Sequence, residues 1–441
     1  MKAPLGLMLT VLLTLTACQR DDDGNAGPAP SRGEADFTRY VAVGNSLTAG
    51  FSDGGLYRSA QLTSYPNLLA EQFRQAGGGE FIQPLFSAEQ ANGTGYQRLS
   101  RIPQSAIELL TSVVAVPAQA VRGQAAPGRP LFTKFTGQSN NNLGVPGIRM
   151  ADVLTPGYGS AQGNPYFERL LPDNSPKTYL DYVSDNLAGA TFFTCWMGNN
   201  DVLAYALSGG ASPPTPTALF TTNNTALINK LTENDRKGVV IGIPNMTAAP
   251  FFTTVTIPVV LSTINLTRPG QPPLQNLIVQ TAAGPRASRS GDLLLLTGAG
   301  DYARIGSTSA GTGQGPYGLS PANPLPTQLV LDADEAAAVV AKVNELNAVL
   351  KQQADAKGLA FVDPNGILTQ LAQSGGLTSD GVTYNLSYIQ GGVISLDGIH
   401  LTPAGYALVA NEIIRAINAK YKSTLPLLDT SRYRRVYIQA S

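Results

Sequence analysis

Short apolar runs that end at turn-forming residues recur along this chain, and they limit the folds that it can adopt. Four of them have the length of strands and are almost continuously apolar: Tyr40–Val43, Thr191–Met197, Val239–Ile243 and Leu359–Val362. Such runs are typical of strands in a parallel sheet that is covered on both faces. A fifth run, Phe81–Leu85, could be another strand, although Pro84 would place it at an edge.

Amphipathic helices lie between these runs. Residues 334–357 carry apolar side chains at helical spacing with polar residues between them. A last helix is predicted to begin at Thr402-Pro403, with Thr402 as N-cap and Pro403 at the first helical position. Its apolar stripe, from Tyr406 to Ile417, is expected to face the core. The alternation of strands and helices implies a doubly wound α/β fold, whose active sites lie at the carboxyl ends of strands.

Two stretches do not follow this alternation. Residues 87–140 and 250–330 are rich in Gly, Pro, Thr and Asn, and we predict insertions that form lids, hairpins or a cap. The apolar run at 251–266 could line an acyl site, but it is more typical of a strand packed on the core. Glycine patterns within 298–318 resemble dinucleotide fingerprints, but neither is predicted to open a helix, so we expect no bound nucleotide.

Composition excludes several classes of function. Among 441 residues, Lys+Arg and Asp+Glu both number 30, which argues against a dedicated nucleic-acid-binding protein. The chain has one histidine, His400, so metal sites built from several histidines are excluded. We expect no nucleic-acid partner, and neither a metal nor an organic cofactor, because residues of the chain itself can supply proton transfer and oxyanion stabilisation.

The N-terminus is typical of export. Lys2 precedes an apolar run that is short for a membrane span, and the run ends at Leu15-Thr16-Ala17-Cys18. This ending resembles the lipobox of bacterial lipoproteins, which implies a signal peptide over 1–18 and lipidation of Cys18. An ordinary secretory signal and a short membrane anchor remain alternatives. Because the chain has only two cysteines, lipidation would leave Cys195 unpaired.

Residues 19–36 lack apolar periodicity, and we predict a flexible linker there. Their acidic cluster, Asp21–Asp23, resembles the surface-export signal of Bacteroidota lipoproteins, although acids near a chain end also keep a linker hydrated. We expect an extracytoplasmic protein that is anchored by lipid to a bacterial membrane, with the outer membrane and the cell surface as the expected places.

Three short blocks place polar or glycine residues where catalysis would need them. Gly44-Asn45-Ser46-Leu47 follows the first strand and puts a serine where a nucleophile would lie. Residues 141–147 end in Gly147, whose backbone N–H could approach a substrate oxygen. Gly198-Asn199-Asn200-Asp201 follows the second strand, where an asparagine N–H can stabilise an oxyanion. Each block taken alone is also ordinary turn chemistry.

The fourth block is Asp397-Gly398-Ile399-His400, just before the last helix. A carboxylate three residues before an imidazole can fix its tautomer and stabilise the imidazolium that forms during general-base catalysis. A lone histidine is more often structural or exposed. Here it follows an acid in a chain whose other blocks supply a serine and oxyanion donors, and this combination favours a hydrolase.

The four blocks, in this order, resemble those of the SGNH hydrolases, also called the GDSL esterase/lipase family. The resemblance implies a three-layer α/β/α sandwich with a small parallel, flavodoxin-like sheet over residues 37–425, followed by a tail at 426–441. It also implies roles for the matching residues: Ser46 as nucleophile, His400 as base and Asp397 as its orienting acid. The oxyanion hole would consist of the backbone N–H groups of Ser46 and Gly147 and the Asn200 side chain, with Gly144 as an alternative donor.

The sequence departs from the family pattern in two ways. Asn45 replaces the usual aspartate before the serine, and Asn200 and Asp397 lie far apart in the chain, so that specificity cannot be transferred from compact relatives. We expect 250–330 to shape the substrate cleft. The expected function is hydrolysis of carboxylic esters, from an acylated glycan or a lipid, through an acyl-enzyme. The alternative is a catalytically silent glycan-binding or structural lipoprotein on the same fold.

Overall fold

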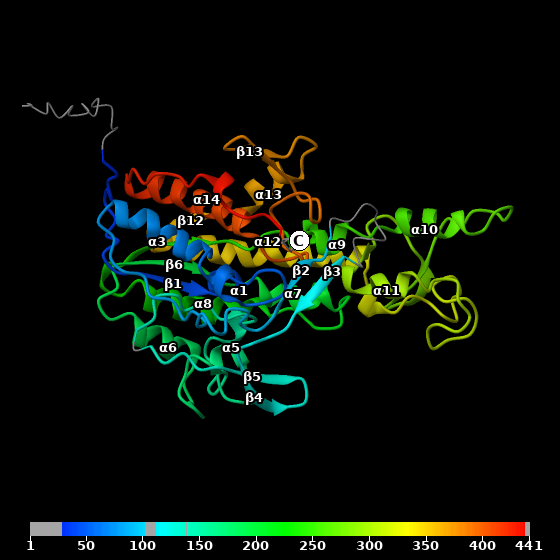
Figure 1. Cartoon of the computed structure of the whole chain (residues 1–441), viewed down its shortest axis with the longest axis horizontal. Helices are drawn as coiled ribbons and strands as arrows, with labels where there is room; N and C mark the ends of the chain where they lie inside the picture. Colours follow the sequence, from blue (N-terminus) through cyan, green and yellow to red (C-terminus); the bar gives the residue numbers. More distant parts are fainter. Residues whose placement is uncertain (1–28, 102–111, 138, 437–441) are drawn as a thin grey trace, which may run out of the picture.

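A parallel sheet of four strands forms the centre of the computed structural model, which describes residues 29–101, 112–137 and 139–436 (Figure 1). Across the sheet the strands are β1 (Tyr40–Gly44), β6 (Phe192–Trp196), β7 (Lys237–Ile241) and β12 (Ala360–Val362). Every neighbouring pair is parallel. These are the four apolar runs predicted as strands, so that prediction is confirmed.

The prediction of a strand at Phe81–Leu85 is wrong. Ile82 exchanges hydrogen bonds only with Asn141, and Pro84 has no N–H with which to extend a ladder. The segment 141–145 instead runs beside β1: Ala42 N donates to Asn141 O (2.8 Å), Leu143 N to Ala42 O (2.8 Å) and Val145 N to Gly44 O (3.0 Å). With this irregular segment included, the order across the sheet is second, first, third, fourth, fifth along the chain, as in flavodoxin-like sheets. The order reverses between β1 and β6, where such folds place their ligands.

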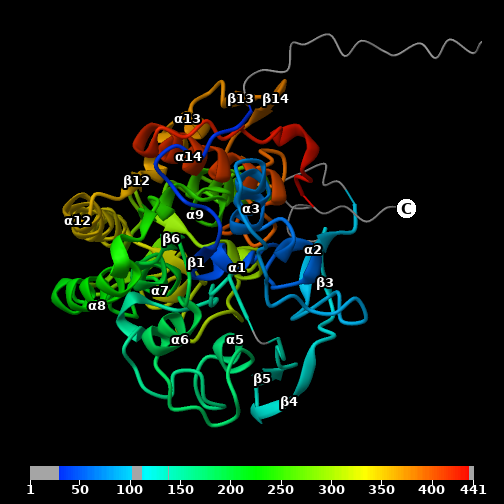
Figure 2. The ribbon, with the colours of Figure 1, turned by 90° about the vertical axis from the view of Figure 1, so that its left-hand side faces the viewer.

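Helices cover both faces of the sheet, as Figure 2 shows, so the predicted three-layer α/β/α sandwich is confirmed. Val41 and Val43 of β1 face one helical layer, and Tyr40 and Ala42 face the other, because side chains alternate along a strand. The first layer contains α6 (Tyr179–Asn186), α7 (Asn200–Leu207), α8 (Thr217–Leu231) and α12 (Ala333–Ala356). The second contains α3 (Tyr65–Gln75), α13 (Pro364–Ala372) and α14 (Pro403–Tyr421).

Capping residues set where the two longest helices begin. Asp332 accepts hydrogen bonds from the backbone at the start of α12, within one residue of the predicted boundary. Thr402 Oγ1 accepts from Gly405 N (3.0 Å) at the start of α14, and Pro403 occupies its first turn as predicted. The carboxyl end of the sheet therefore leads into α14 directly after His400.

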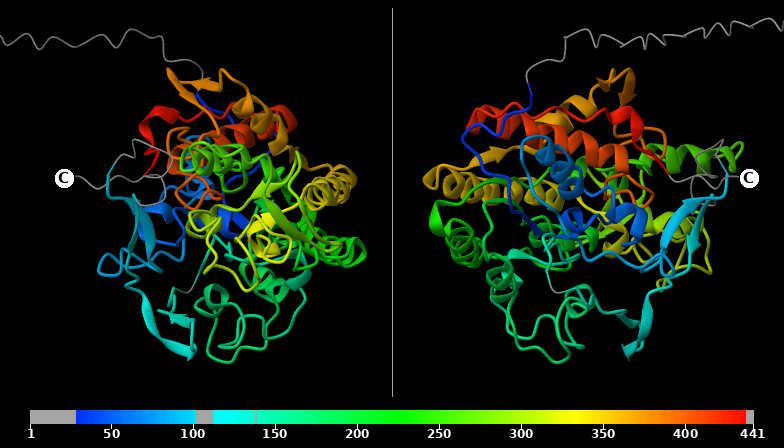
Figure 3. Two further views of the ribbon diagram at one scale, coloured as in Figure 1. Left: turned by 90° about the vertical axis from the view of Figure 1, so that its right-hand side faces the viewer. Right: turned by 60° about the vertical axis from the view of Figure 1, so that its left-hand side comes forward.

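Residues 87–140 form two hairpins, β2 (Tyr96–Leu99) with β3 (Val113–Val116) and β4 (Val121–Ala126) with β5 (Arg129–Phe132), the second of which projects from the layers (Figure 3). The run at 251–266 is not a strand, because Pro250 and Pro258 lie in first turns and Thr256 caps the second of two helices. These helices are α9 (Pro250–Thr253) and α10 (Ile257–Leu266). The region continues with β8 (Ile278–Thr281), β9 (Gly284–Ala287), β10 (Leu293–Leu294), α11 (Ala299–Tyr302) and β11 (Val330–Leu331), and much of it packs around a core of its own.

The remaining short elements are α1 (Ser46–Ala49), α2 (Arg58–Gln61), α5 (Pro165–Glu168), β13 (Leu377–Ser379) and β14 (Val382–Tyr384). Within the described ranges, no helix combines the length and the apolar character that crossing a bilayer requires. Cys18 and the predicted signal peptide lie outside the described residues.

The described residues nearest to the two chain ends, from residue 29 and up to residue 436, are held more firmly than a flexible linker and a tail would be. Ser31 N donates to Thr424 Oγ1 (2.8 Å) just after α14, although the sequence places residue 31 in a flexible linker. In the predicted tail, Leu428 N donates to Asn411 Oδ1 (2.7 Å) on α14. The tail then continues to Arg434, which lies 3.1 Å from Asp53.

Candidate active site

A chain of hydrogen bonds joins three side chains from opposite ends of the sequence. His400 Nε2 lies 2.9 Å from Ser46 Oγ, and His400 Nδ1 lies 2.8 Å from Asp397 Oδ2. An ionised carboxylate can only accept, so Nδ1–H donates to Asp397 and Nε2 is left to accept from the serine hydroxyl. The residue pair predicted from the fourth block is thus brought to the serine of the first.

Local geometry at the end of β1 exposes the serine to the imidazole. Ser46 is the first residue of α1, and Asn45 caps this helix by accepting Leu47 N at its Oδ1 (3.0 Å). The N–H groups in the first turn of a helix have no intrahelical acceptor. Asn45 binds that of Leu47, and among the described residues the N–H of Ser46 has no acceptor. The hydroxyl and the backbone N–H predicted to act as nucleophile and oxyanion donor therefore belong to one residue of this turn.

Asp397 is held as a carboxylate by its neighbours. Its Oδ1 accepts the backbone N–H groups of Ile399 (2.9 Å) and His400 (2.8 Å), and its Oδ2 accepts Gly54 N (3.0 Å). Burial alone would raise the pKa of Asp397, but the charge of His400 and these hydrogen bonds outweigh burial and hold the pKa well below its usual range. The carboxylate stays ionised and can stabilise an imidazolium.

The turn that carries Asp397 and His400 needs glycine at one position. Gly398 has a φ of +77°, and a Cβ there would lie 3.0 Å from Phe251 N. Phe251 N donates to Gly398 O (3.0 Å), so the start of α9 packs directly on this turn. Within the described residues, 250–330 touches the site through this contact and does not line the pocket beside Ser46, which differs from the expected role in shaping the cleft.

Ser395 and the buried Asp53 support the same loop, and sequence reasoning missed both. Ser395 Oγ donates to Asp397 Oδ1 (3.2 Å) and accepts Asp53 N (2.9 Å). Asp53 Oδ1 accepts Leu396 N (3.2 Å), so one side chain ties the segment after α1 to the loop before His400. Asp53 belongs to no motif and lies 342 residues from Ser395. The sequence therefore holds no local signal for this contact.

Arg434, in the predicted tail, compensates the charge of Asp53. Its Nη2 lies 3.1 Å from Asp53 Oδ2, and Tyr57 Oη donates to the same oxygen (2.6 Å). The Asp53 side chain is fully buried, whereas that of Arg434 is 28% exposed. A residue close to the end of the chain thus helps to fix the loop that carries the imidazole.

Asn200, predicted as an oxyanion donor, lies at the start of α7 after β6. Its Nδ2 donates to Ile148 O (2.8 Å), which fixes the orientation of the amide and leaves a second N–H for another acceptor. Asn200 and Ser46 line the same pocket. The parallel pairing of β1 with β6 explains why the first and third blocks meet.

The two glycine candidates differ in their surroundings. Gly144 N already donates to Asn142 Oδ1 (3.1 Å), and a Cβ on Gly144 would lie 2.3 Å from Ala49 N. Gly147 has a φ of +83°, and among the described residues its N–H has no hydrogen-bond acceptor. Of the two, Gly147 keeps a free donor, whereas Gly144 allows close packing of the backbone.

Asp201 links the third block to the segment after the second. It accepts the backbone N–H groups of Met150 (2.6 Å) and Ala151 (3.2 Å), which follow Gly147 and Ile148. Burial raises its pKa to about 6, although these hydrogen bonds act in the opposite direction. Asp201 therefore positions the backbone next to the candidate oxyanion donors.

Asn45, the departure from the family pattern, has two roles. Besides capping α1, its Nδ2 donates to Asn199 Oδ1 (3.1 Å). An aspartate could still cap the helix but could not make the second bond, because it has no donor when ionised. Asn45 thus joins the serine turn to the residue before Asn200.

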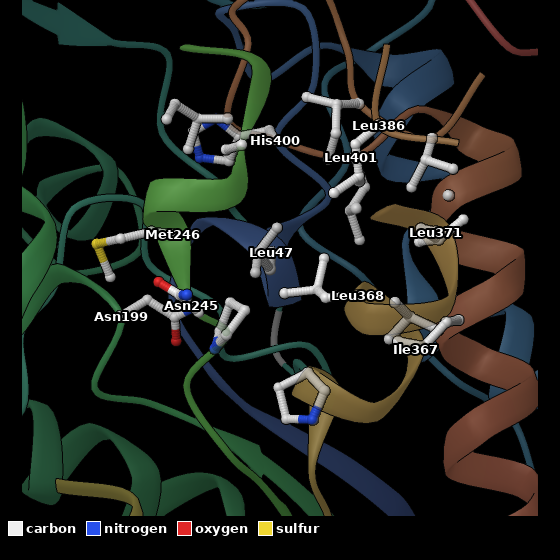
Figure 4. A pocket seen from close by; sticks show the side chains of 18 of the residues that line it. Leu47, Asn199, Asn245, Met246, Ile367, Leu368, Leu371, Leu386, His400 and Leu401 are labelled. Atoms are coloured by element: carbon white, nitrogen blue, oxygen red, sulfur yellow. The ribbon is translucent and has the colours of Figure 1, made fainter. Parts of the chain in front are cut away.

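A narrow pocket opens beside these residues at the carboxyl ends of the four central strands (Figure 4). Ser46, Asn199, Asn200 and His400 contribute its polar wall, and most other lining residues are apolar. Elsewhere within the described ranges, no three His, Cys, Asp or Glu side chains gather as metal ligands would. The second cysteine, Cys195, is buried in β6, which raises its pKa to about 12 and makes it a poor nucleophile.

Several solved structures are similar to this chain at low sequence identity. An α/β hydrolase, LAE5, from the metagenome of Lake Arreo in Spain is 11% identical, with 88% of this chain and 97% of that chain covered and a TM-score of 0.34. An extracellular lipase from Streptomyces rimosus is 16% identical (87% and 99% covered, TM-score 0.32). A variant of an acetyl xylan esterase from Geobacillus stearothermophilus is 10% identical (87% and 95% covered, TM-score 0.32). No curated protein matches the chain.

Family membership follows from the sequence as a whole. Residues 40–413 match the model of the GDSL-like Lipase/Acylhydrolase family, which is most of the chain. The match includes all four blocks and the strands that position them. The chain therefore belongs to the GDSL-like lipase/acylhydrolase family and is a carboxylic ester hydrolase.

Proposed function

We propose that the protein is a serine esterase in which Ser46, His400 and Asp397 form the catalytic triad and an acyl-enzyme forms on Ser46. The observation that supports this most strongly is the distance of 2.9 Å between His400 Nε2 and Ser46 Oγ. It is the distance that a general base needs in order to take the proton from a nucleophile.

In the first half of the reaction, His400 Nε2 accepts the proton of Ser46 while Oγ attacks the ester carbonyl carbon. Asp397 accepts a hydrogen bond from His400 Nδ1–H and stabilises the imidazolium. The imidazolium then donates its proton to the alcohol oxygen as the ester C–O bond breaks, and the alcohol leaves. In the second half, His400 activates a water molecule that attacks the acyl carbon and releases the acid and Ser46.

Negative charge develops on the carbonyl oxygen in both halves. The backbone N–H groups of Ser46 and Gly147 and the second N–H of Asn200 are the donors that we assign to it. The bond from Asn200 Nδ2 to Ile148 O supports this assignment because it orients the amide before the substrate binds. A donor fixed in advance does not need to reorganise during the reaction.

Anchoring to a membrane is a separate proposal that rests on the N-terminal sequence alone. Lipidation of Cys18 would place the catalytic domain outside the cytoplasm, on a bacterial outer membrane and in reach of acylated glycans or lipid esters. Replacing Cys18 with alanine and measuring the amount of protein in the membrane fraction tests it.

The proposal is tested with a fluorophosphonate probe and a short ester substrate. Labelling is expected in the wild-type protein and absent in Ser46→Ala, whereas Ser59→Ala, an exposed serine on α2, should label normally. Ser46→Ala or His400→Ala should lower the rate of hydrolysis by roughly 10³-fold or more. Full activity in either variant, or no labelling of the wild type, would rule out this mechanism. The second outcome would favour the alternative, a catalytically silent binding protein on the same fold.

A further inference from the structure

We infer that the narrow pocket beside Ser46 holds the acyl chain of the substrate, so that the enzyme prefers esters of straight medium or long acyl chains to acetyl esters. This inference rests on the proposed function, because it needs Ser46 to be the residue that is acylated. The pocket begins at Ser46 and His400 and continues between α13 and α14. Figure 4 shows Leu47 of α1 and Leu368 of α13 facing one another across it.

Polar groups occur at one end of this pocket and are scarce in its interior. Within the part of the chain that the structure describes, no Asp, Glu, Lys or Arg lines the pocket. The polar group of Trp196 is already engaged, because Nε1 donates to Gly242 O (2.9 Å). Asn245 lies beside Asn199 at the polar end, and its Oδ1 accepts Thr247 Oγ1 (2.8 Å). Sugar hydroxyls placed there would lose their hydrogen bonds to water without replacement, whereas methylene groups would gain from burial.

The shape of the pocket favours an unbranched chain. Its volume is about 100 Å³, although more side chains line it than line an open groove of about 800 Å³ beside α10. A small volume that is lined by many side chains is narrow. Its inner end lies among buried side chains, including Ile367, Leu371 and Leu408. The apolar lining of this space suits a straight hydrocarbon chain better than a sugar ring.

The order of the reaction assigns the pocket to the acyl side of the ester. The alcohol must leave before water can attack the acyl-enzyme, while the acyl group stays attached to Ser46 through both halves. An alcohol held among Ile367, Leu371 and Leu408 would have to withdraw from this apolar lining before the second half could begin. An acyl chain in the same place leaves the entrance open to the departing alcohol and the incoming water.

The first test is a series of p-nitrophenyl esters from acetate to octanoate, each used below its micelle concentration. We expect kcat/KM to increase by about fourfold for each added methylene until the chain fills the pocket. A profile that is flat, or that falls from acetate onward, in an enzyme that is labelled at Ser46 would overturn the inference and leave the proposed function intact. If the wild-type protein neither labels nor hydrolyses any ester of the series, both fail.

The second test narrows the pocket. Leu368→Trp is expected to reduce the ratio of kcat/KM for octanoate to that for acetate by at least about tenfold. Gln370→Trp is the matched control, because it places the same side chain on an exposed position of α13 outside the pocket. Should Leu368→Trp fail to fold, Leu386→Trp narrows the pocket from the loop after β14. An unchanged ratio in a folded variant of either kind would contradict the inference.

A third comparison separates the acyl side from the alcohol side and identifies the source of the chain. Methyl octanoate should be hydrolysed faster than octyl acetate, and the reverse order would overturn the acyl assignment. Glycerol monolaurate and sucrose monolaurate carry the same acyl chain on a lipid-like and a sugar alcohol. Release of laurate from either one supports the inference, and the faster of the two identifies the leaving group. Release from neither contradicts it.

Discussion

Two halves of the active site are held by different kinds of support. Ser46 and Asn200 begin helices that directly follow neighbouring parallel strands, so the backbone of the sheet positions them. Asp397 and His400 lie on a loop that depends on side chains distant in the sequence, among them Asp53. The comparison indicates that substitutions far from the reacting atoms should affect the loop half more than the strand half.

Each half also contains a buried aspartate, and the two carboxylates are compensated differently. Asp201, in the strand half, accepts backbone N–H groups and has no ion-pair partner among the described residues. Asp53, in the loop half, is paired with Arg434. We therefore expect the stability that Asp201 contributes to depend on pH, and the stability that Asp53 contributes to depend on Arg434.

The largest expected effect concerns the strand half. Asn200→Ala removes a donor that we assign to the oxyanion, and it should lower kcat by about 10²–10³-fold. Its loss of stability should be small, because only the bond to Ile148 O disappears. Steady-state kinetics and thermal unfolding check the two parts. A decrease of less than about threefold in kcat would contradict the role of Asn200.

The next effect concerns the loop half. Arg434→Met leaves the buried Asp53 charge unpaired, and it should lower the free energy of unfolding by about 2–3 kcal/mol. Because Asp53 holds Leu396 and, through Ser395, Asp397, kcat should fall as well. Arg432→Met is the control, since the Arg432 side chain is 80% exposed and pairs with Asp429 on the surface. Equal effects of the two substitutions would mean that the tail does not support the loop.

The two glycines near the oxyanion give a smaller effect. Gly144→Ala should lower stability by about 2 kcal/mol, because its Cβ would collide with the backbone of Ala49. Gly147→Ala has more space but keeps a positive φ, at a cost of about 1 kcal/mol. If Gly147 is the oxyanion donor, Gly147→Ala should lower kcat more than Gly144→Ala does, although it lowers stability less. If Gly144→Ala lowers kcat more, the donor is Gly144.

The smallest effect at neutral pH is expected for Asp201→Asn. Burial raises the pKa of Asp201 from 3.8 to about 6, so the folded protein binds this proton more tightly than the unfolded chain does. Asp201 therefore contributes stability that is present below pH 3.8 and is lost as the pH rises to about 6. Asp201→Asn should remove this dependence, as urea unfolding at several pH values would show. An unchanged pH dependence would mean that Asp201 is not held as the structure indicates.

The strand half could be predicted from the sequence, because its signals are local. Apolar runs such as Thr191–Met197 identify buried strands, and the polar blocks that follow them must then meet at one edge of the sheet. The start of α14 was predictable for the same reason, since Thr402 and Pro403 act on the next few backbone groups. Parallel topology then places these segments without further information.

The support of the loop half could not be predicted in this way. Nothing near Asp53 or Arg434 in the sequence indicates that they pair, because the contact exists only once both chain ends have packed against the layers. Phe81–Leu85 failed for a related reason: its apolar pattern is that of a strand, but Asn141 and its neighbours occupy the place beside β1. Competition between segments for one edge is decided by tertiary contacts, which a local pattern does not contain.

The bond between Asn45 and Asn199 also sets the direction of a dipole beside Ser46. With its oxygen engaged by Asn45, the Asn199 amide keeps its nitrogen for other partners. An aspartate at position 45 would attract that nitrogen and turn the amide over, leaving an oxygen instead. Aspartate in place of Asn45 would thus reverse the polarity of the Asn199 amide on the pocket wall. We therefore expect the residues at positions 45 and 199 to covary among close relatives.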